Sequence, residues 1–211
     1  MSDLSLYLVT DRGLSRGRST VDIVRAAVAG GVTCVQLREK NCGTREFVDE
    51  ARAVRALLAG TGVPLIVNDR IDVALAVGAD GVHLGQTDMR ITDARRLTGP
   101  GMIIGISAEC LEDAVRAQAE GADYIGVSPV FSTPTKTDTA TPLGLAGIAG
   151  IRAAVSLPLV GIGGIGPANA AAVIRAGCDG IAVVSAIVSA ADPRKAAAEL
   201  KTTILRAREA S

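Results

Sequence analysis

Two cations and an amide recur at every second position early in this chain, at Gln36, Arg38 and Lys40. The sequence predicts a strand here, in which these three side chains share one face because strand side chains alternate. Val35 and Leu37 then occupy the opposite face, where they favour burial. Charged groups are costly to desolvate without partners, so we expect an anionic ligand against the polar face. An edge strand with a solvated polar face is the alternative.

Two aspartates, Asp69 and Asp88, follow two neighbouring predicted strands. Mg2+ favours one or two carboxylates together with the oxygens of a phosphate-bearing substrate, and this pair could supply the carboxylates. Loop aspartates also commonly cap helices, which is the alternative for both. With Arg38, Lys40 and Lys136 nearby, a metal at the two aspartates would complete a site for a highly charged anion such as a diphosphate.

A glycine-rich turn at 163–166 (GGIG) opens a predicted helix and offers a second anion site. Glycines let the backbone approach a ligand closely, and a helix N-terminus directs N–H groups at phosphate. Val184 and Ser185 follow the last predicted strand and would complete this site in a barrel, where phosphate often binds after strands seven and eight. Two anion sites suggest two phosphorylated substrates.

His83 is the only histidine of the chain, which excludes histidine-rich metal sites. It lies in a short apolar stretch that is predicted to form a strand. We interpret it as an interior, hydrogen-bonded residue, with a catalytic role as the alternative.

These groups are far apart in the sequence, so a fold must bring them together. Eight short apolar stretches alternate with helical patterns, which predicts a parallel eight-stranded (β/α)8 TIM barrel in one domain spanning 1–211. The polar residues that follow the strands would then meet at one mouth of the barrel. The predicted strands cover 4–9, 35–40, 65–67, 81–84, 102–106, 124–127, 159–162 and 180–184. The predicted helices cover 20–28, 44–58, 73–77, 92–97, 111–120, 146–155, 168–176 and the chain from 193 onward.

A repeated tetrapeptide supports a closed barrel over an open doubly wound sheet, which is the alternative fold. The sequences VGAD at 77–80, EGAD at 120–123 and AGCD at 176–179 precede the fourth, sixth and eighth strands, and AGGV at 29–32 stands in before the second. Strands three and seven are instead entered through prolines, at Pro64 and Pro158. Because barrel interiors are layered from alternate strands, a closed eight-unit repeat is expected to have one sequence pattern before its even-numbered strands and another before its odd-numbered strands. We call this difference the even and odd signature.

The composition argues for small-molecule partners. Lys+Arg and Asp+Glu both number 22, and aromatic residues make up 2%, which argues against nucleic acid and an anionic membrane surface as partners. The four cysteines form no Cys-x-x-Cys pair, and the N-terminus carries no leader-like segment, so we expect reduced thiols and a cytoplasmic protein. The sequence leaves the oligomeric state open, a homo-oligomer included.

The connection at 128–142 is much longer than the roughly 2 to 6 residues usual after a barrel strand. It is rich in Thr and Pro and contains Lys136. We expect it to act as a mobile cover or a binding loop.

A set of short motifs, in order over nearly the whole chain, resembles the thiamine phosphate synthase family. The motifs are YLVTD at 7–11, QLREK at 36–40, ND at 68–69, HLGQ at 83–86 with Asp88, GIS at 105–107, TPTK at 133–136, GIGGI at 161–165 and VS at 184–185. Each is short, but their joint pattern is highly specific.

The resemblance implies a transferase that joins a hydroxymethylpyrimidine diphosphate to a thiazole phosphate, with Mg2+ as cofactor. It places Mg2+ on Asp69 and Asp88. The residues implied to contact the pyrimidine diphosphate are Gln36, Arg38, Lys40, Asn68, Ser107 and Lys136. Those implied to hold the thiazole phosphate are Thr133, Thr135, Gly164, Val184 and Ser185. The expected catalytic residues among them are Arg38, Lys40, Ser107 and Lys136.

The charges suggest that diphosphate leaves first and that the aminopyrimidine ring stabilises the resulting methylene cation. The enzyme then mainly stabilises the leaving anion and excludes water. One rival is a thiazole tautomerase on the same barrel, which needs neither metal nor diphosphate site; retention of Arg38, Lys40, Asp69, Asp88 and Lys136 argues against it. The other rival is a non-catalytic sensor of a phosphorylated ligand. Whether the thiazole arrives carboxylated stays open.

Overall fold

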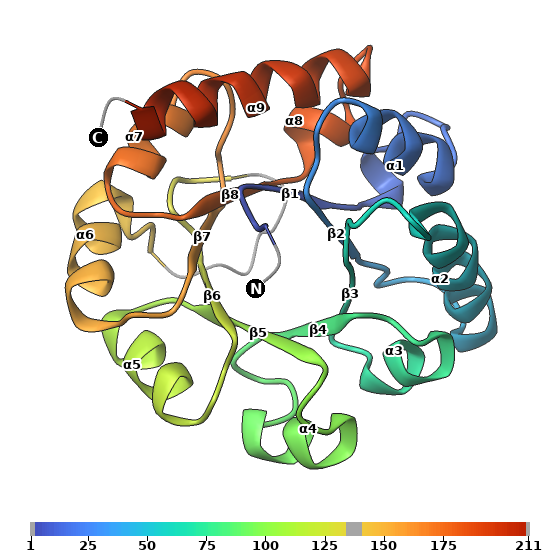
Figure 1. The fold of residues 1–211 in the computed structure, drawn as a ribbon, viewed down its shortest axis with the longest axis horizontal. Helices are drawn as coiled ribbons and strands as arrows, with labels where there is room; N and C mark the ends of the chain where they lie inside the picture. Colours follow the sequence, from blue (N-terminus) through green and yellow to red (C-terminus); the bar gives the residue numbers. More distant parts are fainter. Residues whose placement is uncertain (1–2, 134–140, 210–211) are drawn as a thin grey trace.

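A computed structural model describes residues 3–133 and 141–209, which form a closed barrel of eight parallel strands ringed by helices (Figure 1). Each strand pairs with the next, and β8 pairs with β1 through Tyr7 and Ala182. This closure confirms the predicted (β/α)8 barrel and excludes the open sheet. The strands are β1 (Leu6–Val9), β2 (Cys34–Leu37), β3 (Leu65–Asn68), β4 (Gly81–Leu84), β5 (Ile103–Ala108), β6 (Tyr124–Val127), β7 (Leu159–Ile162) and β8 (Gly180–Val183).

The helices lie outside the strands and cover the barrel on all sides (Figure 1). Two short elements were not predicted, the 3-10 helix η1 and the helix α8. The helical elements are η1 (Arg12–Leu14), α1 (Thr20–Ala29), α2 (Thr44–Leu58), α3 (Ile71–Val77), α4 (Ile91–Thr98), α5 (Leu111–Ala119), α6 (Gly144–Ala154), α7 (Ala170–Arg175), α8 (Ser185–Val188) and α9 (Pro193–Glu209).

The strand predicted over 35–40 is shorter than expected, because β2 ends at Leu37. The backbone N–H of Arg38 turns to the hydroxyl of Thr10, at 3.0 Å, in place of a ladder partner. Gln36 therefore lies in the strand, whereas Arg38 and Lys40 lie in the loop after it. The prediction that all three share one strand face was wrong for the two cations.

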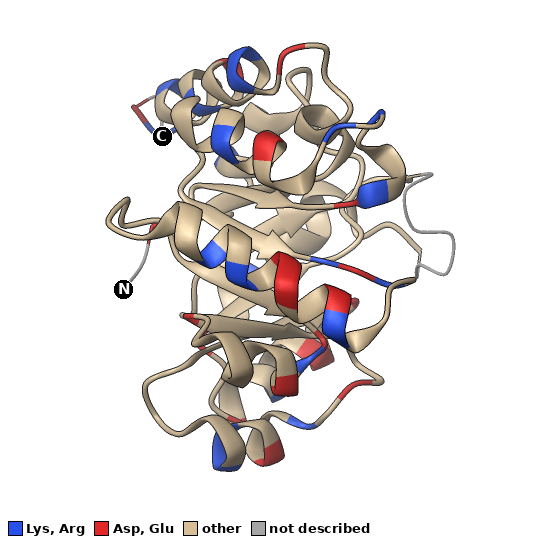
Figure 2. Cartoon of the chain, turned by 90° about the vertical axis from the view of Figure 1, so that its right-hand side faces the viewer, with Lys and Arg blue, Asp and Glu red and all other residues tan. Residues whose placement is uncertain are grey.

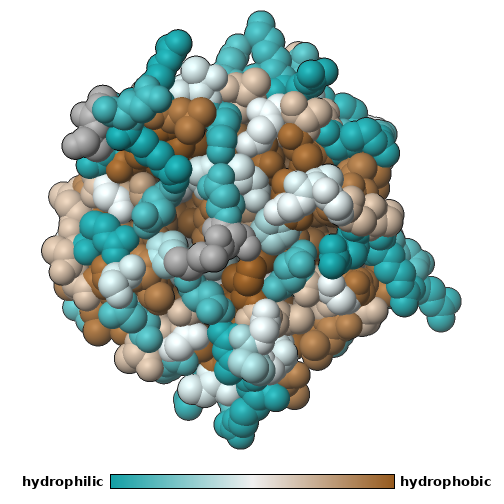
Figure 3. Space-filling model, viewed as in Figure 1, coloured by the Kyte–Doolittle hydropathy of each residue, from teal (hydrophilic) through white to brown (hydrophobic). Residues whose placement is uncertain are grey.

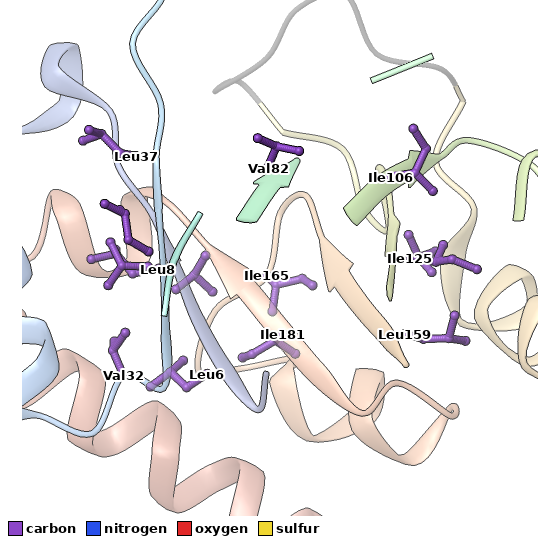
Figure 4. Close-up of a cluster of buried hydrophobic side chains, with 14 of the residues drawn as sticks. Leu6, Leu8, Val32, Leu37, Val82, Ile106, Ile125, Leu159, Ile165 and Ile181 are labelled. Atoms are coloured by element: carbon purple, nitrogen blue, oxygen red, sulfur yellow. The ribbon is translucent and has the colours of Figure 1, made fainter. Parts of the chain in front are cut away.

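Alternate strand positions build two separate apolar layers. Side chains such as Leu8, Val35 and Ile125 point outward against the helices and form the larger cluster, shown in part in Figure 4. The side chains between them point into the barrel, where Tyr7 and Tyr124 are the largest. This alternation is the strand period of two, with both faces buried as parallel sheets require.

The repeated aspartates have a clear structural role. The carboxylates of Asp80 and Asp179 accept hydrogen bonds from the first backbone N–H groups of β3 and β7, both at 2.8 Å, and that of Asp123 accepts one from the second N–H of β5, at Ile104, at 2.7 Å. Before β2, the hydroxyl oxygen of Thr33 accepts a hydrogen bond from the backbone N–H of Leu6, the first residue of β1, at 3.1 Å. Each side chain thus ties an even strand to the odd strand before it, which explains the even and odd signature.

Charged residues of both signs lie on the helices and in the loops, whereas the strands carry none (Figure 2). The face seen in Figure 3 mixes hydrophilic and hydrophobic residues over the helices. Large exposed apolar side chains are scattered over separate helices, among them Leu75, Leu111 and Leu205. Within residues 3–133 and 141–209, no helix is both long enough and apolar enough to span a bilayer.

Candidate active site

A pocket of about 1040 Å³ lies at the carboxyl ends of the strands. It receives side chains from β2, β3, β4, β5 and the loops that follow them, and its floor is the barrel interior. On several strands, the inward positions change from apolar to polar toward this end, as from Ile66 to Asn68 on β3. The sequence therefore places its interior polar groups at the barrel end where active sites form.

The cationic side of the pocket is built by the chain after β2. The Arg38 side chain is 25% exposed, and its Nη1 lies 3.2 Å from the carboxylate of Asp11 after β1. Lys40 pairs with Asp69 from the β3 loop. Both cations thus line the pocket in ion pairs that fix their positions and still leave part of each head group accessible to an anion.

Asp69 and Asp88 face each other across the ends of β3 and β4. Burial, together with the nearby charge of Asp69, holds the pKa of Asp88 above its ordinary value. Asp69 has a backbone φ of 61°, a left-handed conformation that is uncommon outside glycine. Such backbone strain clusters at functional sites, and here it sits at the residue that directs a carboxylate into the pocket.

The glycine turn lies at the opposite side of the pocket, after β7. Gly163 and Gly164 have φ values of 101° and 64°, which side chains rarely adopt. A Cβ on Gly164 would lie 2.6 Å from the carbonyl oxygen of Ser132, so the glycine turn packs closely against the chain that follows β6. The predicted helix 168–176 is shorter, Ala170–Arg175, and starts beyond the turn. Both the backbone of the turn and the residues that lead into α7, as far as its N-cap Asn169, line the pocket.

A buried hydrogen-bond chain crosses the barrel beneath the pocket. It runs from Gln36 Nε2 to the Tyr7 hydroxyl (3.0 Å), to the Tyr124 hydroxyl (2.8 Å), to His83 Nδ1 (2.8 Å), and from His83 Nε2 to Ser107 Oγ (2.9 Å). Burial lowers the pKa of His83 to about 4, so the imidazole is neutral near pH 7. The interpretation of His83 as an interior, hydrogen-bonded residue is confirmed.

Residues 6–187 match the family model described as thiamine monophosphate synthase. The chain is 50% identical over 208 residues to the thiamine-phosphate synthase of Moorella thermoacetica, covering 99% of each chain. It is 58% identical over 155 residues to that of Albidiferax ferrireducens, covering 74% of this chain and 71% of the relative. The solved thiamine phosphate pyrophosphorylase from Pyrococcus furiosus superposes with a TM-score of 0.90 at 43% identity, covering 98% of both chains.

The chain belongs to the thiamine monophosphate synthase family. The resemblance inferred from short motifs is thereby confirmed, and so is the transferase class of the protein. High identity over nearly the full length separates this assignment from a mere likeness of barrel folds.

The family-implied site residues that the structure describes all line the one pocket. They are Gln36, Arg38, Lys40, Asn68, Asp69, Asp88, Ser107, Thr133, Gly164, Val184 and Ser185. Thr135 and Lys136 lie outside the described residues, as do residues 134–140 of the long connection predicted to cover the site. The synthase motifs, although spread over eight units, therefore converge in space, and their individual roles stay predictions.

Sequence reasoning missed Tyr7 and Tyr124 as site residues. Both hydroxyls lie in the barrel interior and connect Gln36 to His83. They are the only two tyrosines of the chain, and each occupies an inward strand position, which was the available signal. Buried tyrosine hydroxyls need partners, so their presence in a synthase core points to a polar network there.

Glu39 is an unusual carboxylate beside the synthase pocket. Its side chain is 5% exposed, and its Oε2 lies 3.5 Å from Arg12 Nε. Within the described residues, its Oε1 is buried without a hydrogen-bond partner. Burial, with the nearby charge of Glu50, raises the pKa of Glu39 to about 7.

We expect Glu39→Gln to stabilise the protein by about 1 kcal/mol above pH 7, because it removes the cost of burying the ionised Glu39 carboxylate. Nearby solvent screens part of that cost, which keeps the expected gain small. A carboxyl whose folded-state pKa is raised costs stability as pH rises from its unfolded value, near 4.5, to about 7. The gain should therefore be small at pH 4.5 and full at pH 8, as measured by urea denaturation. Glu46→Gln is the control, because Glu46 pairs with the same Arg12 but is 56% exposed. A pH-independent gain at Glu39 would contradict this reasoning.

Proposed function

We propose that this chain is a Mg2+-dependent thiamine phosphate synthase, which joins an aminopyrimidine-methyl diphosphate to a thiazole phosphate and releases diphosphate. The observation that carries the proposal is the convergence of cations, paired aspartates and a glycine turn on one pocket of a family member. The two anion-binding sides of the pocket suit two phosphorylated substrates.

The pyrimidine diphosphate fits the side built by β2 to β5. Arg38 can donate two parallel hydrogen bonds to phosphate oxygens, while Lys40 supplies a point charge. Gln36, Asn68 and Ser107 lie deeper, where a neutral heterocycle would sit. We assign Lys136, in the connection after β6, to the same diphosphate.

The residues present fit a magnesium ion. Asp69 and Asp88 each supply hard carboxylate oxygens. Because the two carboxylates are close together, their negative charges repel, and a bound cation would relieve that repulsion. The Lys40 ammonium on Asp69 already compensates part of that charge. Among the described residues, no third acidic, cysteine or histidine side chain joins them, so substrate oxygens would complete the coordination.

The thiazole phosphate fits the glycine side. Gly164, Val184 and Ser185 offer backbone and hydroxyl groups at the ends of β7 and β8, and Thr133 adds a hydroxyl from the connection after β6. Thr135 belongs to the same proposed set. In this proposal, the thiazole ring lies between its own phosphate on the glycine side and the methylene carbon of the pyrimidine.

The chain's own residues then favour a dissociative reaction. Arg38 and Lys40 stabilise the charge that grows on the leaving diphosphate, and Mg2+ when bound neutralises the same charge. The electron-rich aminopyrimidine stabilises the methylene cation, and the pocket excludes water from it. The thiazole nitrogen is already a nucleophile, so no general base is needed, consistent with the neutral, buried His83.

The decisive assay mixes the protein with both substrates and Mg2+ and measures diphosphate and thiamine phosphate. The proposal expects both products in equal amounts. A thiazole tautomerase would convert the thiazole without releasing diphosphate, and a sensor would bind one ligand without turnover. Either result would refute the proposed function.

Replacing Asp88 with asparagine should raise the Mg2+ concentration needed for half-maximal turnover by about tenfold, because one carboxylate ligand is lost. Asparagine keeps an oxygen that can accept the hydrogen bond from Gly85 N, now 2.6 Å from the Asp88 carboxylate, so the loop is preserved. Asp93→Asn, in an exposed ion pair on α4, is the control. An unchanged magnesium titration for Asp88→Asn would remove this residue from the metal site.

A further inference from the structure

The orientation of the Gln36 amide, together with the number of protons available, gives a direction to the buried hydrogen-bond chain under the pocket. Tyr7 is 1% exposed and accepts a hydrogen bond from the amide of Gln36, so its single proton must go elsewhere. Its neighbours are the Tyr124 hydroxyl, at 2.8 Å, and the thiol of Cys34. Oxygen is the stronger acceptor, so Tyr7 donates to Tyr124.

The remaining links then follow in order. Tyr124 has received a hydrogen bond from Tyr7 and gives its own proton to His83 Nδ1, at 2.8 Å. A neutral imidazole that accepts at Nδ1 carries its proton on Nε2, and this N–H donates to Ser107 Oγ, at 2.9 Å. With that lone pair occupied, the proton of Ser107 is left to point into the pocket.

We propose that Tyr7, Tyr124 and His83 are positioning residues that fix Ser107 as a hydrogen-bond donor and Gln36 as an acceptor toward the substrate. The inference rests on the proposed function for the identity of that substrate, but the direction of the chain does not. A fixed donor and a fixed acceptor on opposite sides of the pocket floor suit a heterocycle that carries both an amino group and a ring nitrogen.

Two other arrangements of these groups are self-consistent. In the first, Tyr7 donates to the Cys34 thiol and accepts from both Gln36 and Tyr124, and the imidazole proton of His83 lies on Nδ1. The second reverses the direction of the whole chain. It would turn the carbonyl oxygen of Gln36 to Tyr7 and place the imidazole proton on Nδ1 of His83. Ser107 would then donate to His83 and could only accept from a ligand. Because both alternatives place the imidazole proton on Nδ1, the tautomer of His83 separates them from the proposed arrangement and reports whether Ser107 donates or accepts in the pocket.

The chain offers a direct measurement, because His83 is its only histidine. Protein labelled with 15N-histidine should give one pair of imidazole nitrogen signals, with the proton on Nε2 and Nδ1 unprotonated, in the ligand-free protein at pH 7. A proton on Nδ1 would overturn the proposal. This readout needs neither substrate nor turnover, so it stands even if the diphosphate-release assay refutes the proposed function.

Two matched variants test which hydroxyl sets the tautomer. Tyr124→Phe removes the donor to Nδ1 and should give a mixture of tautomers, with kcat/KM for the pyrimidine diphosphate lowered about tenfold and KM for the thiazole phosphate unchanged. Tyr7→Phe also deletes one buried hydroxyl but leaves the Tyr124 donor in place, so the Nε2 tautomer should persist. A pure Nε2 tautomer in Tyr124→Phe would refute the positioning role.

Discussion

Replacing Arg38 with alanine is expected to lower kcat for diphosphate release on the order of 100-fold to 1000-fold, the loss typical of removing one preorganised donor to a developing anion. The Arg38 side chain is held by Asp11, at 3.2 Å, and is three-quarters buried at the pocket wall. Because Arg38 is already held in position, its guanidinium need not move when negative charge develops on the leaving group. KM for the thiazole phosphate should change little, because that substrate is assigned to the glycine side. Steady-state kinetics with each substrate varied in turn measures both parameters.

Two further variants separate charge from geometry. Arg38→Lys keeps the charge but loses the planar fork, so its kcat should fall between the wild type and Arg38→Ala. Arg52→Ala is the control, because Arg52 is 61% exposed and pairs with Asp49 on the same helix, α2. Equal losses of kcat and thiazole phosphate affinity in Arg38→Ala would argue against a role at the leaving group.

The barrel could be predicted because its signals are local and repeated. Strand and helix periods alternate along the chain, and the aspartates at Asp80, Asp123 and Asp179 mark the even strands. The structure shows the physical cause of that mark, since each carboxylate accepts a hydrogen bond from a backbone N–H at the start of the preceding odd strand. Closure of the barrel follows once eight such units occur in sequence.

The details of the site depend on contacts between distant strands, which periodicity does not encode. The end of β2 at Leu37 is set by the hydroxyl of Thr10 on a neighbouring segment, so alternation alone carried the predicted strand too far. The contact between Tyr7 and Tyr124 joins residues 117 positions apart. Family resemblance supplied the residues that line the pocket, but it gave no account of the hydroxyls that hold them in place.

Gly105→Ala is expected to destabilise the protein by about 3 kcal/mol, the upper part of the range for overpacking. A Cβ at Gly105 would lie 2.0 Å from Cζ and 2.4 Å from the hydroxyl oxygen of Tyr124 on the paired strand β6. The ring is 1% exposed and bonded at its hydroxyl to Tyr7 and His83, so it cannot move without breaking the buried hydrogen-bond chain. Urea denaturation measures the loss.

Gly150→Ala is the matched control for the same change in a different setting. Gly150 is exposed within α6, and a Cβ there would meet nothing within 4 Å. Alanine should therefore stabilise the helix by about 0.5–1 kcal/mol, since it restricts the unfolded chain more than glycine does. Opposite signs for the two variants would show that the space reserved for the Tyr124 ring, rather than glycine flexibility, is what Gly105 provides. A Gly105→Ala protein as stable as the wild type would mean that Tyr124 is held less firmly than its hydrogen bonds imply.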